Sequence, residues 1–136
     1  MENTHTHKVK ILENHLDTFG HVNNSKYLEI FEQARWEIIC DAGWGVDDIK
    51  RKGMGPVVLE VNIKFLAEVK NREEVDIISI PASWKGKIGK FKQKMVKSDG
   101  SLASEIDLVF GFFDTKERGL VEPPKDWLDL MAGINE

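Results

Sequence analysis

One long segment with a wide apolar face, followed by alternating segments joined by short turns, most constrains the fold of this chain. Residues 57–66 and 102–113 alternate regularly from one side to the other, which is typical of strands. Residues 24–42 instead carry apolar side chains at helical spacing over a broad arc, made of Tyr27, Leu28, Ile30, Phe31, Ala34, Trp36, Ile38, Ile39 and Ala42. A helix that is apolar over so broad an arc needs a sheet to cover it.

The remaining segments add strands and turns to the same plan. Asp99-Gly100 predicts a tight hairpin turn, and Pro124 marks the start of a short terminal helix. Three further strands are expected over residues 8–13, 75–80 and 87–97, with a turn at 83–86 and a bulge at Gly89. Because short connections join antiparallel neighbours, the sequence predicts an α+β domain in which one antiparallel sheet wraps around one long helix.

Length and composition restrict the class of protein. The 136 residues suit one domain, and we expect residues 1–136 to form it. The net charge of −4 gives no general attraction to nucleic acid or to an acidic membrane. With neither a signal sequence nor an apolar stretch of about 20 residues, the chain is expected to be cytoplasmic, with no nucleic acid and no membrane among its partners. The one cysteine, Cys40, is expected as a buried, inert thiol on the helix.

The polar loop before the helix carries the residues that indicate chemistry. Asn23, Asn24 and Ser25 are types that cap a helix N-terminus, so we expect the helix to begin near residue 24. Its first-turn N–H groups then face the loop, where the positive end of the helix dipole favours an oxyanion. Asp17 lies just upstream. A carboxylate beside such donors is the minimal equipment for hydrolysing an activated acyl group.

A long, gapless motif runs through this loop and into the helix: Asp17-x-x-Gly20-His21-Val22-Asn23-Asn24-x-x-Tyr27, then Phe31-Glu32-x-Ala34-Arg35-Trp36. It resembles the signature of the hotdog-fold acyl-CoA thioesterases of the 4-hydroxybenzoyl-CoA thioesterase type, most closely their bacterial fatty acyl-CoA branch. The resemblance implies hydrolysis of acyl-CoA to a carboxylic acid and free coenzyme A, with a role in fatty acid metabolism. It also implies that no cofactor or metal is needed, and that the chain forms a homodimer or homotetramer with sites at subunit interfaces.

The resemblance assigns three catalytic roles. Asp17 matches the family's catalytic carboxylate, acting either as general base for water or as nucleophile on the thioester carbon, and the spacing leaves both open. Asn24 matches the position whose backbone N–H polarises the thioester carbonyl, without need of its side chain. For His21 two roles remain open: it orients the water or the carboxylate, or it bonds the loop to the sheet.

Substrate contacts are expected from five further residues. Gly20 lets the loop approach the substrate closely, Phe19 shapes an acyl pocket, and Tyr27 packs with its hydroxyl near the loop. Lys87 and Lys90 belong to a basic strand and are expected to meet the phosphates of coenzyme A, although a solvated strand edge is the usual explanation for such lysines.

Several alternatives stay open on sequence alone. Glu32 and Arg35 have the spacing of a helical salt bridge, while a second branch of the family uses a helix carboxylate as catalyst, which makes Glu32 or Glu29 a fallback. Where many relatives carry a proline, this chain has Ala67-Glu68, which leaves acyl specificity open. A noncatalytic acyl-CoA sensor and a thioesterase acting on acyl carrier protein are the rival functions.

Overall fold

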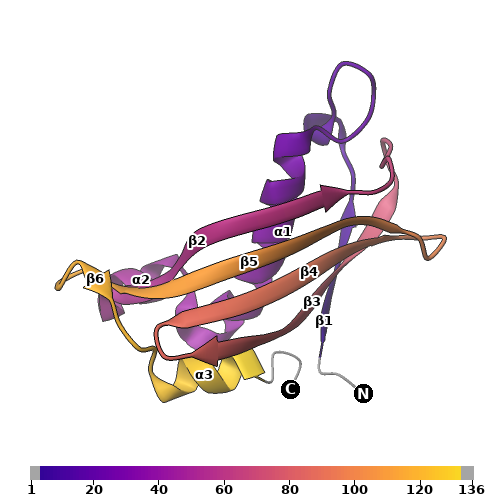
Figure 1. The fold of residues 1–136 in the computed structure, drawn as a ribbon. Helices are drawn as coiled ribbons and strands as arrows, with labels where there is room; N and C mark the ends of the chain where they lie inside the picture. Colours follow the sequence, from indigo (N-terminus) through magenta and orange to yellow (C-terminus); the bar gives the residue numbers. More distant parts are fainter. Residues whose placement is uncertain (1–3, 133–136) are drawn as a thin grey trace.

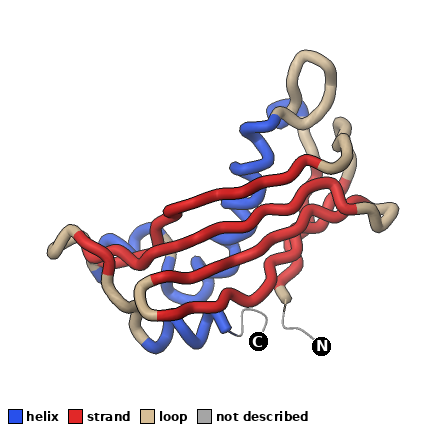
Figure 2. The backbone as a smooth tube through the Cα atoms, in the orientation of Figure 1, coloured by secondary structure: helices blue, strands red, loops and turns tan. Residues whose placement is uncertain are grey.

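A computed structural model describes residues 4–132, with one antiparallel sheet curled around a long helix (Figures 1 and 2). The sheet has the order β1-β3-β4-β5-β2, with β6 paired to β5. Its strands are β1 (His5–Lys10), β2 (Met54–Phe65), β3 (Glu74–Lys85), β4 (Ile88–Lys97), β5 (Leu102–Asp114) and β6 (Gly119–Leu120). The helices are α1 (Asn24–Ile39), α2 (Val46–Lys52) and α3 (Lys125–Ala132), with the short turns η1 (Glu13–His15) and η2 (Cys40–Trp44). The predicted α+β class, with one sheet around one central helix, is confirmed.

The start of α1 is set by its capping residue. Asn23 has extended backbone angles, and its side-chain Oδ1 accepts from Ser25 N at 3.0 Å, which confirms the predicted start. The helix ends earlier than predicted, at Ile39, because the chain widens into η2 and Gly43 takes a φ of +87° there. Cys40 lies in this turn and is exposed, so the expected burial of its thiol is wrong.

The concave face of the sheet covers the apolar face of α1. Tyr27, Ile30, Phe31, Ala34 and Ile38 on α1 are all buried. They pack in one core with inward-facing strand residues, among them Val75, Ile77, Phe91, Met95, Ala103, Ile106, Leu108 and Phe112. The broad apolar arc of the sequence is therefore explained by a sheet that surrounds the helix on several sides.

Two strand predictions differ from the structure. β1 lies at His5–Lys10, earlier than predicted, and β3 runs on to Lys85, where residues 83–86 were expected to turn. Gly89 is no bulge: it pairs with Trp84, and a Cβ at Gly89 would lie 2.1 Å from the Trp84 ring. The glycine is needed because an aromatic ring occupies the space above it.

A cluster of aromatic rings joins α3 to the far end of α1. Trp44 meets Phe112 and Trp127 edge to face, each with ring centroids 5.4 Å apart, and Trp84 meets Trp127 at 6.0 Å. Leu128 N donates to Pro124 O at 3.2 Å, so Pro124 stands at the start of α3 as predicted. The C-terminal helix thereby closes one end of the space between α1 and the sheet.

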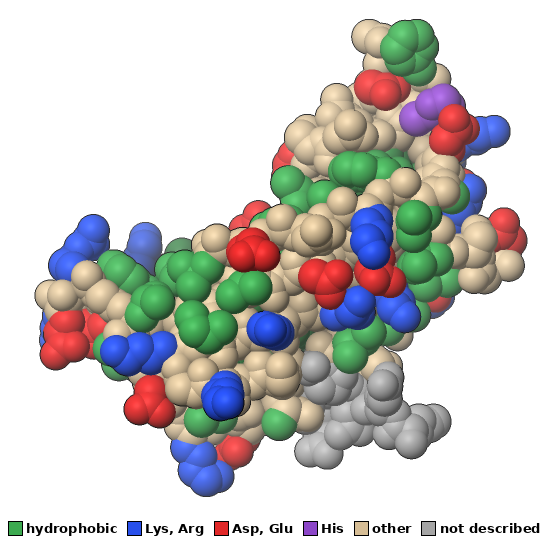
Figure 3. Space-filling view, viewed as in Figure 1, with side chains coloured by type: hydrophobic (Ala, Val, Ile, Leu, Met, Phe, Trp, Pro, Cys, Tyr) green, Lys and Arg blue, Asp and Glu red, His purple; other side chains and the backbone are tan. Residues whose placement is uncertain are grey.

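Strand β2 forms one edge of the sheet and stays partly uncovered. Its side chains Val58, Val61 and Phe65 face the side of α1, yet 44%, 41% and 46% of each is exposed. The opposite, outer face of the sheet is shown in Figure 3, with hydrophobic side chains towards the β6 end and charged ones over the middle. There Lys92 pairs with Glu105 at 2.8 Å and with Asp107 at 3.2 Å. Within residues 4–132, no helix is long and apolar enough to cross a membrane.

Candidate active site

The Asp17 side chain is held by the backbone of its own loop. Its Oδ1 accepts from Phe19 N at 2.8 Å and from His21 N at 3.2 Å. Asp17 N donates to His21 O at 2.8 Å, which closes the loop at its base. Oδ2 has no hydrogen-bond partner among the described residues. The carboxylate is thus fixed in place through one oxygen, with the other left for a ligand or a water molecule.

Residues at the loop tip take the conformations that this closure requires. Gly20 has a φ of +82°, a left-handed conformation that a residue with a Cβ rarely adopts, which agrees with its expected backbone role. Phe19 lies beside it, with 83% of its side chain exposed. In one chain, Phe19 therefore projects from the loop, away from the core.

The N-terminus of α1 presents a free donor beside this carboxylate. Ser25 N is capped by Asn23, and Lys26 N donates to Asn23 O at 2.8 Å. The backbone N–H of Asn24, the first residue of the helix, has no acceptor within residues 4–132. This donor lies at the positive end of the helix dipole, where it suits a carbonyl oxygen that gains negative charge.

Asp17 and Asn24 border a common hollow at the end of β2. Tyr27 borders it from the first turn of α1, and its ring meets that of Phe65 at a centroid distance of 5.0 Å. Burial raises the pKa of the Tyr27 hydroxyl, so the phenol is neutral near neutral pH. The other residues around the hollow are His21, Val22, Leu66, Ala67 and Glu68. The structure therefore brings Asp17, His21 and Asn24, the three residues expected to be catalytic, to one hollow.

His21 ties the loop to the segment between β2 and β3. Its backbone forms a bridge with Lys70, and its Nε2 lies 3.4 Å from Glu68 Oε2. Of the two roles left open for His21, the structure contains contacts that tie the Asp17 loop to the β2–β3 connection. Sequence reasoning missed Glu68 as a site residue, although the Ala67-Glu68 departure marked its position.

The two lysines expected at the coenzyme lie away from Asp17 in a single chain. Lys87 follows the β3–β4 turn at Gly86, at the end of the sheet opposite the Asp17 loop (Figure 1). Lys90 is exposed on the outer face of β4, beside Glu60 and Asp107. Within one chain, neither lysine joins the hollow around Asp17.

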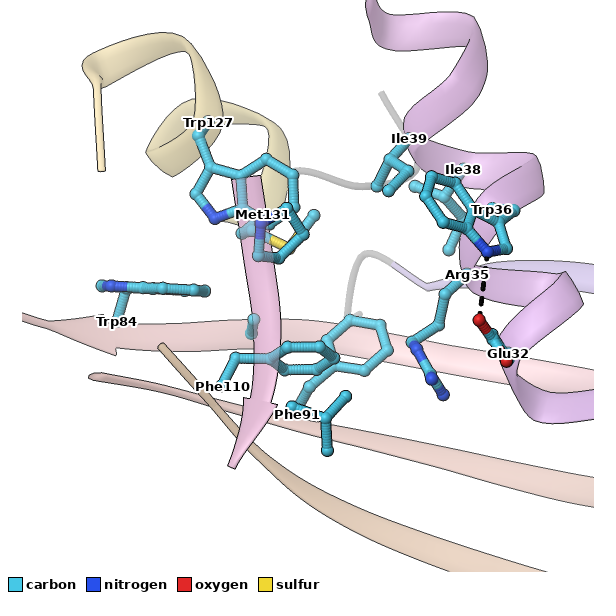
Figure 4. Close-up of a pocket in the computed structure, with 13 residues that line it drawn as sticks. Glu32, Arg35, Trp36, Ile38, Ile39, Trp84, Phe91, Phe110, Trp127 and Met131 are labelled. Atoms are coloured by element: carbon cyan, nitrogen blue, oxygen red, sulfur yellow. Dashed lines mark hydrogen bonds between the residues drawn. The ribbon is translucent and has the colours of Figure 1, made fainter. Parts of the chain in front are cut away.

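A second and more enclosed hollow, here called the Arg35 pocket, lies towards the other end of α1 (Figure 4). It contains about 120 Å³ of free space. Its residues come from α1, β2, β3, β4, β5 and α3: Glu32, Arg35, Trp36, Ile38, Ile39, Pro56, Val58, Ala82, Trp84, Phe91, Phe110, Trp127 and Met131. The walls are almost entirely apolar and include five aromatic side chains, which is typical of a pocket for an apolar group.

The predicted salt bridge between Glu32 and Arg35 is wrong. Arg35 Nη1 donates to Gln93 Oε1 at 3.0 Å, while Glu32 Oε2 accepts from Trp36 Nε1 at 3.3 Å. The fully buried Gln93 offers Arg35 a better-placed acceptor than the exposed Glu32 does. Glu29, the other fallback catalyst, pairs with Lys26 at 3.1 Å.

The comparisons with known proteins show the family and the fold of the chain. Residues 11–131 match the model of the thioesterase-like superfamily. The chain belongs to this superfamily. It is 26% identical to the long-chain acyl-CoA thioesterase FadM of Escherichia coli over 110 residues, which are 80% of this chain and 83% of FadM.

One further relative and one solved structure are informative. It is 28% identical to the chloroplastic acyl-acyl carrier protein thioesterase ATL3 of Arabidopsis thaliana over 74 residues, 54% of this chain and 39% of ATL3. A Staphylococcus aureus protein solved in complex with CoA superposes with a TM-score of 0.89 at 16% identity, over 100% of this chain and 87% of that one. The fold is therefore the hotdog fold, as the motif implied.

Proposed function

We propose that this chain hydrolyses acyl-CoA thioesters to a carboxylic acid and free coenzyme A. The observation that carries the proposal is the pairing of a backbone-anchored Asp17 carboxylate with the free Asn24 N–H in one hollow. Membership of the thioesterase-like superfamily and the similarity to a long-chain acyl-CoA thioesterase support thioester hydrolysis as the reaction.

In the proposed reaction the thioester carbonyl oxygen accepts from Asn24 N–H. Asp17 takes a proton from water, and the resulting hydroxide adds to the carbonyl carbon. The tetrahedral oxyanion is stabilised by the same N–H and by the helix dipole. Its collapse breaks the C–S bond and releases coenzyme A as a thiolate, which takes up the proton held by Asp17, and this restores the general base. In the variant of this scheme with Asp17 as nucleophile, Oδ2 adds to the carbonyl carbon, and the tetrahedral intermediate expels the coenzyme A thiolate to leave a mixed anhydride. Water then hydrolyses the anhydride to the carboxylic acid and free Asp17.

The proposed unit is at least a homodimer, joined through the free edge of β2. An exposed, long and apolar edge strand favours pairing with another chain. A second copy related by a two-fold axis would pair its β2 antiparallel. The Asp17 end of each β2 then lies beside the Met54 end of its partner, next to the partner's Arg35 pocket. The same pairing brings the partner's Lys87 turn towards the site, which supports its role, with Lys90, at the coenzyme phosphates.

An acyl carrier protein is the second candidate source of the thioester. The similarity to ATL3 favours it, since its thioester is carried on the same type of pantetheine arm. The two sources differ in what lies outside the hollow: a nucleotide in one case and a protein surface in the other.

Thiol release from matched acyl-CoA and acyl carrier protein substrates tests both candidates. We expect steady release from acyl-CoA and a loss of about 10²–10⁴-fold in kcat for Asp17→Asn, because this change removes the general base and keeps the shape. Asn24→Ala is the matched control, since it leaves the backbone N–H in place. Absence of thiol release from every acyl-CoA would refute the proposal, and release from the carrier alone would favour the second candidate.

The proposed dimer is tested by Val61→Asp, which places a carboxylate on the uncovered side of β2. We expect this variant to elute as a monomer in size-exclusion chromatography and to lose thiol release. Asn62→Asp, one residue along on the opposite face of β2, should keep the dimer. A monomeric wild-type protein with full activity would contradict the proposed assembly.

A further inference from the structure

Arg35 differs from the other three arginines of the chain because it is half-buried rather than exposed, and it has no carboxylate partner among the described residues. None of the ion pairs formed within residues 4–132 includes it. Burial lowers the pKa of its guanidinium to about 10, partly offset by the charge of Glu32, so Arg35 remains protonated at neutral pH. The Arg35 pocket therefore contains a positive charge that forms no ion pair within the described part of the chain, although the charge of Glu32 acts on it.

The position of this charge is fixed by buried groups. Gln93 Nε2 donates to Phe31 O at 3.1 Å and to Ser79 Oγ at 3.0 Å, which leaves its Oε1 to accept from Arg35. The guanidinium also lies over the Phe110 ring, 5.7 Å from its centroid. Figure 4 shows Arg35 reaching from α1 to the level of Phe91 and Phe110. A cation fixed in this way can direct its remaining N–H groups at a ligand with little loss of entropy.

The rest of the pocket suits an apolar group of limited size. Its free space of about 120 Å³ is similar to the cavity of about 150 Å³ that binds benzene in an engineered protein. Glu32 contributes the other ionised group, and its Oε2 is already occupied by Trp36 Nε1. A ring or a short length of chain fits such a space, with Arg35 as the polar contact.

We propose that the Arg35 pocket binds the distal part of the acyl group, and that Arg35 selects acyl groups that carry an oxygen acceptor there, a carboxylate most strongly. This inference rests on the proposed thioesterase function and names its substrate class. A carboxylate forms short, charge-assisted and often bidentate hydrogen bonds with a guanidinium. An acyl group that ends in a methyl displaces water from the cation and forms no hydrogen bond with it.

Acyl analogues that cannot be hydrolysed separate this inference from catalysis. The probes are S-alkyl-CoA thioethers in matched pairs of equal length, ending in a methyl group or a carboxylate, with titration calorimetry on the full chain. We expect the wild type to bind the carboxylate member about tenfold or more tightly at the length that reaches Arg35. Arg35→Met should erase this preference while it keeps most of the apolar stem.

Two further variants make the test specific. Arg51→Met removes an exposed arginine of α2 that pairs with Asp48 and should leave the preference unchanged. Arg35→Lys keeps the charge without the planar guanidinium and should retain part of the preference for the carboxylate member. If Arg35→Met does not fold, the reduced preference of Arg35→Lys tests the inference instead. Equal binding of both members at every length, or an equal loss of both in Arg35→Met, would overturn the inference. A preference in the absence of any thiol release would support the role of Arg35 and refute only the proposed hydrolysis.

Discussion

At one end of α1, Asp17 is held by backbone N–H groups no more than four residues away, whereas at the other end Trp44, Trp84 and Trp127 come from three separate elements. The first end is exposed and polar, and its loop is held together by local hydrogen bonds. The second is buried and depends on the complete fold. The comparison indicates that the proposed chemistry and most of the stability reside in different parts of the molecule, which the proposed dimer would bring together.

The largest expected effect tests whether the two ends meet across the dimer. Asp17→Asn removes the general base, and Ala82→Trp fills the Arg35 pocket, so each variant alone should lose orders of magnitude in thiol release. When equal amounts are refolded together, half of the dimers combine both variants and each contains one intact site. We expect recovery to about a quarter of wild-type activity.

The control for this mixture is Asp17→Asn refolded with the double variant Asp17→Asn, Ala82→Trp, which should stay inactive. If Asp17 used the pocket of its own chain, the mixture of single variants would also stay inactive.

The apolar end should dominate stability. Trp127→Ala removes a side chain that is only 2% exposed and contacts Trp44, Trp84 and Phe112, so we expect a loss of about 3–5 kcal/mol in the free energy of unfolding. Urea unfolding gives the value. Leu128→Ala, the neighbouring and more exposed position on α3, is the control and should cost much less. Similar losses for both would contradict the importance of the aromatic cluster.

The polar end should contribute less to stability. Asn23→Ala removes the cap on Ser25 N, with an expected loss of about 1 kcal/mol in the free energy of unfolding and a drop in kcat as the first turn of α1 frays. Asn24→Ala removes a neighbouring exposed side chain and should change neither quantity. A loss of several kcal/mol for Asn23→Ala would erase the contrast between the two ends.

The smallest expected effect concerns acid stability near the Asp17 loop. Glu13 accepts from Asn71 Nδ2 at 2.9 Å and from Arg72 Nη2 at 2.8 Å. These bonds, with Asn71 first, lower the pKa of Glu13 from 4.5 to about 2. Because the folded pKa lies below the unfolded one, this contribution to stability is present above about pH 4.5 and is lost as the pH falls towards 2.

Glu13→Gln should therefore lower stability slightly at neutral pH and flatten the acid part of the profile. Carboxyl titration by NMR gives the pKa of Glu13 directly. A pKa at its ordinary value would show that the bonds to Asn71 and Arg72 do not persist in solution.

The contrast between the two ends also explains what could be predicted from the sequence. The Asp17 loop and the start of α1 are formed by contiguous residues, so motif and capping rules indicated them directly. The Arg35 pocket depends on contacts such as Arg35 with Gln93, 58 residues apart, which helical spacing cannot reveal. That spacing favoured Glu32 as the partner of Arg35, whereas in the structure Arg35 donates to the buried Gln93 on β4. The role of Gly89 likewise depends on Trp84 across a hairpin.

The placement of the tryptophans has a spectroscopic consequence. All four of them, Trp36, Trp44, Trp84 and Trp127, lie towards one end of the molecule, and three line the Arg35 pocket. The hollow around Asp17 contains none. The intrinsic fluorescence of the chain is thus a built-in reporter for that pocket. A ligand bound there would change the tryptophan emission, whereas a ligand confined to the Asp17 hollow would leave the emission nearly unchanged.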